Sequence, residues 1–135
     1  MKAKNLDKYA WKHRINAFLK DNVRNREGKQ MIDWNRIEEL KSEVGEDDFA
    51  EVVEMFFEEV AEALKRLSVD STETAAKDLH FVKGSALNIG LSRVSELCRA
   101  AEAALREAPD ADLNINAIQA AFNNSKAKLN TVLAL

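Results

Sequence analysis

Apolar residues recur at three- and four-residue steps along most of the chain, with polar residues between them. This spacing places the apolar side chains on one face of a helix. The clearest case covers about residues 46–67, where we expect a long amphipathic helix with one buried face and one solvated, acidic face. The buried face is predicted to consist of Phe49, Val52, Val53, Phe56, Val60, Ala63, Leu64 and Leu67, and the solvated face of Glu51, Glu54, Glu58 and Glu62.

The same periodicity predicts further helices on both sides of this one. Asp33 and Ser92 are candidate N-caps, while Gly45, Gly90 and Pro109 mark positions at which helices are expected to end. The predicted segments cover about residues 7–26, 33–45, 72–89 and 92–108, and a last one runs from Asp110 or Asp112 to near the end of the chain.

Short connections between amphipathic helices favour antiparallel neighbours. Four Gly and one Pro in 135 residues are too few for a turn-rich β architecture. We therefore predict an all-α fold, an antiparallel up-down four-helix bundle with additional N-terminal helical segments. A basic helical extension over residues 1–30 is expected to precede a bundle domain over 31–135.

The net charge of −3 is unevenly distributed along the chain. Residues 1–30 hold nine Lys/Arg and three Asp/Glu, so the remaining residues carry a net charge of −9. A basic arm of this kind could contact nucleic acid or a membrane, or it could pack on the acidic body. Trp11, Ile15, Phe18 and Leu19 form an apolar stripe in the arm, which favours packing, so we expect neither nucleic-acid nor membrane binding.

The cysteine content and the apolar runs bear on the compartment. Cys98 is the one cysteine, so no intrachain disulfide can form, as is typical of proteins in a reducing compartment. No apolar run approaches the roughly 18–20 residues of a membrane span, and we see no secretory signal. We expect a cytoplasmic protein.

The segment from Leu79 to Gly90 holds the candidate chemistry. On a helix at about 100° per residue, its apolar positions define a core face about 140° away from His80. His80 therefore points into solvent, with Lys83 and Gly84 one turn further along the same exposed side. The residues of the predicted core face are Ala75, Leu79, Val82, Ala86 and Ile89.

An exposed histidine beside a lysine and a glycine suits phosphoryl transfer. Neutral imidazole is a good nucleophile near pH 7, since its ordinary pKa is about 6.5. Attack on an acyl phosphate needs an in-line approach and a cation near the phosphoryl oxygens. Lys83, three residues after His80, can supply that cation as a point charge. Gly84, four residues after His80, leaves room for a partner to approach.

Three further residues on this side are candidates for docking a partner. Leu87 and Leu91 continue the line of His80, and their apolar side chains would supply contact area. Asn88 could touch either a phosphate or the partner. We interpret Ser85 as a packing residue, Cys98 as part of the core, and Phe81 as packing against a neighbouring helix.

The pattern His80-x-x-Lys83-Gly84-Ser85-Ala86-x-x-x-Gly90 resembles the signature of histidine-phosphotransfer (HPt) domains of bacterial two-component phosphorelays. Residues 32–40 and the long helix that follows are also similar to that family, so the resemblance covers about residues 31–135. It implies a four-helix bundle whose histidine exchanges a phosphoryl group with receiver-domain aspartates of response regulators and hybrid histidine kinases.

The resemblance also implies how the chemistry is divided between the partners. The receiver domain would supply the acidic pocket and the Mg²⁺, so this chain is expected to need no cofactor and to bind no metal. Nothing in it resembles an ATP-binding kinase core, which predicts a phosphocarrier without autokinase activity. A single small bundle favours a monomer.

Two other classes of function are compatible with parts of the sequence. A bundle that docks and modulates a response regulator without transferring phosphate is the closest alternative, although the presence of both His80 and Lys83 favours transfer. A di-iron or haem bundle would need inward-facing Glu-x-x-His pairs, whereas His80 is predicted to point outward.

Overall fold

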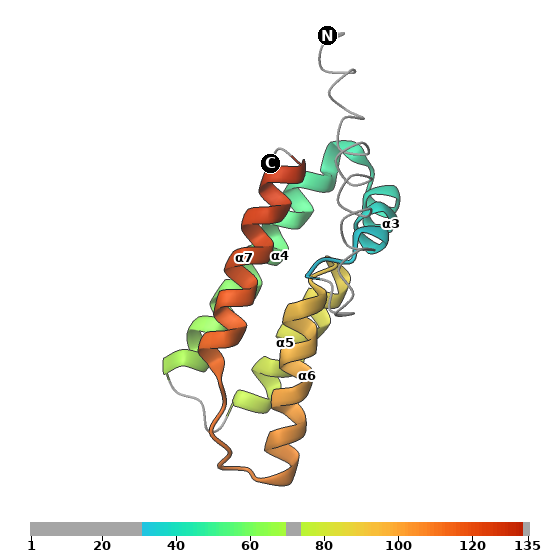
Figure 1. The fold of residues 1–135 in the computed structure, drawn as a ribbon. Helices are drawn as coiled ribbons and strands as arrows, with labels where there is room; N and C mark the ends of the chain where they lie inside the picture. The colour runs from blue at the N-terminus through green and yellow to red at the C-terminus, as the bar shows by residue number, and fades with distance from the viewer. Residues whose placement is uncertain (1–30, 70–73, 134–135) are drawn as a thin grey trace, which may run out of the picture.

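The computed structural model describes residues 31–69 and 74–133, where all regular secondary structure is helical (Figure 1). The predicted extension over residues 1–30, with its helix at 7–26, lies outside the described residues. Asp70 and Ser71, which directly precede the helix predicted over residues 72–89, also lie outside the described residues. The helices, labelled as in Figure 1, are α3 (Trp34–Val44), α4 (Glu46–Val69), α5 (Ala75–Asn88), α6 (Ser92–Glu107) and α7 (Ile115–Leu133).

Four of these helices form a bundle. The long helix α4 packs against both α5 and α7, and α6 also packs against both α5 and α7, so the four helices close a ring around one core. The short helix α3 packs on α4 near the end of the bundle at which α5 turns into α6 (Figure 1). The predicted all-α four-helix bundle is confirmed.

The core face of α4 is rotated relative to the sequence prediction. Phe57, which the prediction left out, is 1% exposed, whereas Val52 and Phe56 are only half-buried. The reason lies in α7, because the Phe122 ring meets the Phe57 ring edge to face at a centroid distance of 6.0 Å. The predicted solvated face of α4 is confirmed, since Glu51, Glu54, Glu58 and Glu62 are all exposed.

Local capping explains most of the helix boundaries. The Asp33 carboxylate accepts a hydrogen bond from the Arg36 backbone N–H at 3.1 Å, so the predicted N-cap of α3 is confirmed. Gly45, with a φ of 89°, ends α3 as predicted. Helix α6 begins at Ser92, but Ser92 does not occupy the N-cap position, which belongs to Leu91.

The start of α7 was predicted wrongly. The helix begins at Ile115 rather than at Asp110 or Asp112, and the Asn114 side chain caps it by accepting a hydrogen bond from the Ala117 N–H at 3.1 Å. Leu113 and Ile115 pack against the core. The residues after Pro109 therefore form the connection from the end of α6 to the start of α7.

Gly90 organises the turn between α5 and α6 and also holds the entry to α3. Its φ of 73° lies in the left-handed region that favours glycine. Its carbonyl accepts a hydrogen bond from the Asp33 N–H at 2.7 Å, and the Arg93 N–H donates to the Met31 carbonyl at 3.3 Å. A Cβ on Gly90 would lie 2.8 Å from the Asp33 carbonyl oxygen. The prediction that α5 stops at a structural glycine is confirmed.

The Gly90 turn gives a stability prediction. Gly90→Ala should lower the free energy of unfolding by at least about 2 kcal/mol, because it combines left-handed backbone strain with a clash against the main chain of residue 33. Gly84→Ala is the matched control. The added methyl there meets nothing within 4 Å, so this variant should gain up to about 1 kcal/mol from helix propensity. Denaturant unfolding of both variants measures the difference, and equal stabilities would contradict the role assigned to the turn.

Candidate functional site

His80 lies on the solvent-facing side of α5. Its side chain is 75% exposed, while the core positions Leu79, Val82 and Ala86 on the same helix are fully buried. The predicted outward orientation of His80 is therefore confirmed. Its Nδ1 atom lies 3.2 Å from Oε2 of Glu102, which comes from the neighbouring helix α6.

Lys83 and His80 share the same carboxylate. The Lys83 Nζ atom forms an ion pair with Oε1 of Glu102 at 2.7 Å. The Glu102 side chain is only 11% exposed and thus bridges two side chains of α5 from a largely buried position. Lys83 therefore lies beside His80, as the sequence predicted, and Glu102 holds both side chains.

The surroundings of Glu102 keep its carboxylate ionised. Burial by itself would raise the pKa of Glu102, but the Lys83 ammonium and the His80 ring outweigh that effect, and the pKa lies below its ordinary value. An ionised carboxylate can only accept hydrogen bonds, so the proton of a neutral His80 ring belongs on Nδ1. This leaves the lone pair of Nε2 on the exposed side of the ring, available as a nucleophile.

Sequence reasoning missed Glu102. The residue follows the buried Cys98 by four positions and adjoins the half-buried Ala101, which puts it at the edge of the apolar stripe of α6. A carboxylate at the edge of an apolar stripe is the one signal that the sequence offered. Which residue of α5 it would face depends on how the two helices align, and periodicity alone does not contain that information.

The surface beyond His80 is open, as the docking hypothesis requires. A Cβ at Gly84 would meet no atom within 4 Å. Leu87 is 56% exposed and Asn88 is exposed as well, with its carbonyl accepting a hydrogen bond from Arg36 Nε at 2.9 Å. Phe81, which we predicted to pack on a neighbouring helix, is 40% exposed, so any such packing leaves part of its ring open to solvent.

The prediction that Leu91 belongs to the docking surface is wrong. Its side chain is fully buried in the core. The error has a simple cause, because α5 ends at Asn88 and the positive φ of Gly90 turns the chain away. The angle of about 100° per residue that placed Leu91 beside His80 does not hold across that turn. Ser85, by contrast, is buried as predicted.

Comparison with known families bears directly on this site. The model of the Hpt domain matches residues 51–132, a stretch that includes His80, Lys83 and Glu102 and spans more than half of the chain. The chain belongs to the Hpt domain family. No curated protein and no solved structure matches it.

The Hpt match runs from within α4 into α7, so it covers the four-helix bundle and leaves out α3. In the part of the chain that the structure describes, no helix is both long enough and apolar enough to cross a membrane. The same residues contain no group of three or more His, Cys, Asp or Glu side chains placed to hold a metal ion.

Cys98 lies beneath the site but cannot act as a nucleophile there. Its side chain is fully buried, and burial, together with the nearby Glu102 charge, raises the pKa of the thiol to about 12. Cys98 therefore stays protonated at neutral pH and belongs to the core, as predicted.

The contact between Glu102 and His80 predicts a tautomer preference that can be measured directly. Glu102→Gln replaces an ionised acceptor by a neutral amide, so the share of His80 rings with the proton on Nε2 should rise. Because His80 is largely exposed, we expect the preference for the Nδ1–H tautomer to fall by about 1 kcal/mol, which is about fivefold in the tautomer ratio. The ¹⁵N shifts of the ring report this ratio at a pH where the ring is neutral. Glu96→Gln on the same helix is the control, and equal shifts in the two variants would contradict the assignment.

Proposed function

We propose that this Hpt domain relays a phosphoryl group between receiver-domain aspartates in a two-component phosphorelay, with phospho-His80 as the intermediate. The observation that carries the proposal is the ring orientation of His80. Its Nδ1 faces an ionised carboxylate at 3.2 Å, which leaves Nε2 exposed to an approaching partner.

The proposed step balances without a further co-reactant. The Nε2 lone pair attacks the phosphorus of an aspartyl phosphate. The N–P bond forms as the bond between the phosphorus and the aspartyl oxygen breaks, and the aspartate leaves as a carboxylate. The Nδ1 proton stays on the ring, which becomes positively charged, and the Glu102 carboxylate offsets that charge. Transfer to a second receiver reverses these bond changes. The Mg²⁺ for the reaction would come from the receiver domain.

Lys83 would assist in two ways. Through its ion pair at 2.7 Å it holds Glu102 in place against His80. Its ammonium lies one helical turn from the imidazole, where it can also interact with the oxygens of the incoming phosphoryl group. Both effects favour the charged groups that develop during transfer.

The exposed apolar side chains support docking at the same face. Met55, Phe81 and Leu87 are the exposed large hydrophobic residues of the described chain, and two of them are on α5 with His80. We propose that Leu87, Asn88 and the open surface at Gly84 receive the partner. We further propose that the protein is a cytoplasmic monomer that cannot phosphorylate itself from ATP.

Substitution of His80 tests the proposal. Because the side chain is largely exposed, His80→Gln should leave the melting temperature nearly unchanged while abolishing transfer of label from a phosphorylated receiver. The wild-type label should be acid-labile and base-stable, as expected of a phosphoramidate, and His13→Gln should retain it. Labelling of the His80→Gln variant would refute the claim that His80 is the phosphoryl acceptor. Receiver binding without any transfer by the wild-type protein would instead indicate a docking module.

Gly84 separates docking from the reactivity of the histidine itself. Glycine within a helix costs about 1 kcal/mol relative to alanine, and the open space around Gly84 shows that packing does not demand it. Gly84→Gln should preserve or raise the melting temperature yet reduce transfer from a receiver at least tenfold, because its side chain stands where the partner must come. The rate with a small donor such as phosphoramidate should change much less. An equal loss with both donors would point to a distorted site.

A further inference from the structure

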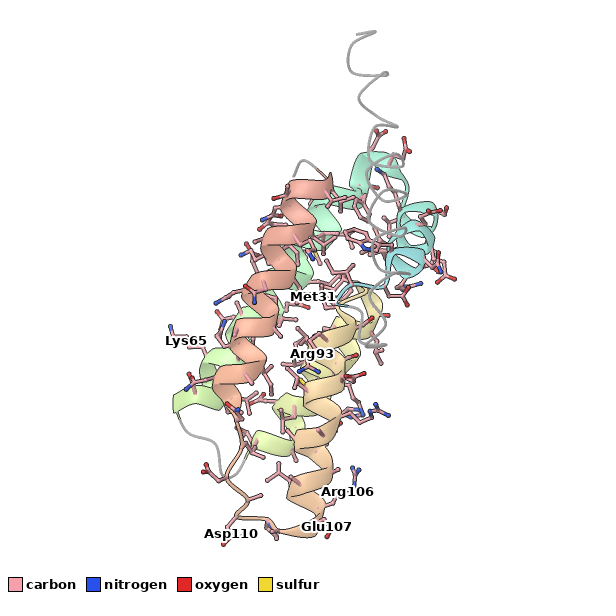
Figure 2. The ribbon with its side chains drawn as sticks, viewed as in Figure 1. Met31, Lys65, Arg93, Arg106, Glu107 and Asp110 are labelled. Atoms are coloured by element: carbon pink, nitrogen blue, oxygen red, sulfur yellow. The ribbon has the colours of Figure 1, made fainter. Side chains whose placement is uncertain are left out.

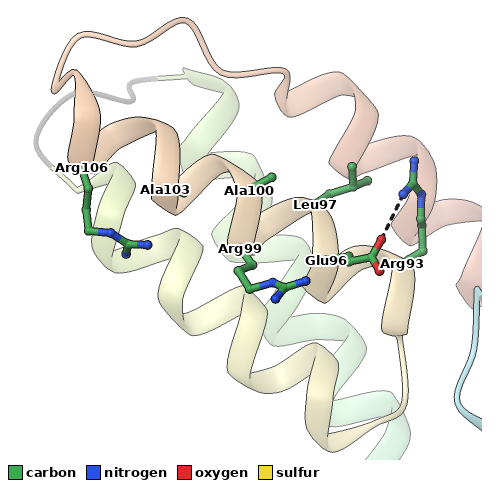
Figure 3. A pocket seen from close by; sticks show the side chains of 7 residues that line it. All are labelled: Arg93, Glu96, Leu97, Arg99, Ala100, Ala103 and Arg106. Carbon is green, nitrogen blue, oxygen red and sulfur yellow. Dashed lines mark hydrogen bonds and ion pairs between the residues drawn. The ribbon is translucent and has the colours of Figure 1, made fainter. Parts of the chain in front are cut away.

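Two arginines flank the Glu102 carboxylate along α6. Arg99 precedes Glu102 by three residues and Arg106 follows it by four, so all three share one side of the helix. Figure 3 shows the Arg99 and Arg106 side chains extending from the side of α6 that faces α5, the helix that carries His80. Both arginines are exposed. They lie along the edge of the candidate site.

These two arginines differ from the other arginines that the structure describes. Arg36 pairs with Glu39 and Glu43, Arg66 with Asp78, and Arg93 with Glu96. Within residues 31–69 and 74–133, Arg99 and Arg106 form neither an ion pair nor a side-chain hydrogen bond. The carboxylate nearest to both in helical spacing is Glu102, whose two oxygens face His80 and Lys83 instead.

The surface between the arginines leaves their guanidinium groups accessible. A shallow recess of about 660 Å³ on α6 is lined by Arg99, Ala100, Ala103 and Arg106 together with Leu97 and the Arg93–Glu96 ion pair. The small alanine side chains do not shield the charged groups. Arg106 lies seven positions after Arg99, which corresponds to about 10 Å along a helix. A partner surface could therefore engage both at once.

The charge of the remaining molecule argues for the kind of partner. Residues 31–135 carry a net charge of −9, and α4 presents five exposed glutamates. A polyanion such as DNA or a lipid surface would be repelled by most of this body. A protein partner needs to be acidic only where it meets α6, which suits the two free arginines.

We propose that Arg99 and Arg106 form a docking edge for the phosphoryl-exchanging partner, and that they bind two carboxylates about 10 Å apart on its surface. The inference rests on the proposed function, because it assigns to that partner the surface beside His80. Charge-assisted Arg–carboxylate contacts at the rim of an interface chiefly raise the rate of association. The edge would thus select acidic receivers and speed their encounter with His80.

The test compares two double variants of the full chain that each remove two positive charges. Arg99→Gln with Arg106→Gln removes the edge, while Lys65→Gln with Lys128→Gln removes two exposed charges from α4 and α7. Figure 2 labels Lys65 and Arg106. With a phosphorylated receiver at limiting concentration and low salt, the edge variant should transfer about tenfold more slowly than the control variant. Raising the salt concentration should bring the two rates together. At saturating receiver the maximal rate should be nearly the same.

Other outcomes would overturn the inference in distinguishable ways. Equal transfer rates for the two variants, with an active wild-type protein, would refute the docking edge alone. A comparable loss of the edge variant's reaction with phosphoramidate would show that the arginines act on His80 and not on docking. DNA binding that disappears in the edge variant would assign the arginines to a nucleic acid. A wild-type protein that accepts phosphate from no receiver would refute the proposed function and this inference with it.

Discussion

The Glu102 carboxylate joins the two helices on which the candidate site depends. It lies at the interface of α5 and α6, largely shielded from water, with Lys83 at one oxygen and His80 at the other. A charge in that position is tolerated only when it is paired, and the pairing here uses the two side chains that the chemistry needs. The same contact orients the imidazole, keeps its Nε2 exposed and restrains the lysine beside it.

This contact requires a particular alignment of α5 and α6, and the Gly90 turn provides it. The turn reverses the chain within a few residues and is held from outside by the Asp33 N–H, while the next residue, Leu91, is drawn into the core. Helix α3 is thereby tied to the bundle at the point where the alignment is set. A change far from His80 could therefore disturb the histidine through the register of two helices, which is one reason to measure stability alongside transfer.

Negative charge is concentrated on the outer face of α4, whereas unpaired positive charge lies on α6. The outer face of α4 is acidic and makes the body unattractive to polyanions. Among the arginines of the described residues, Arg36, Arg66 and Arg93 pair with neighbouring acids, whereas Arg99 and Arg106 lie on α6 without an ion pair. Exposed apolar residues, Leu87 and Phe81, lie on α5 itself. A partner would thus meet apolar contacts and free positive charge together, around a reactive nitrogen.

The sequence by itself determined the helical architecture, the outward orientation of His80, the neighbouring Lys83 and Gly84, and the resemblance to the family that the Hpt match then showed. These features follow from periodicity and local spacing, which a helix converts directly into faces. Only the tertiary structure decided that Glu102 holds His80, that Leu91 is buried, that Phe57 is buried more deeply than Phe56, and that α7 begins at Ile115. Each of these depends on how one element meets another, through helix register, a turn with positive φ, or a ring from a distant helix. Local periodicity carries no information about such contacts, because they form only when the segments pack.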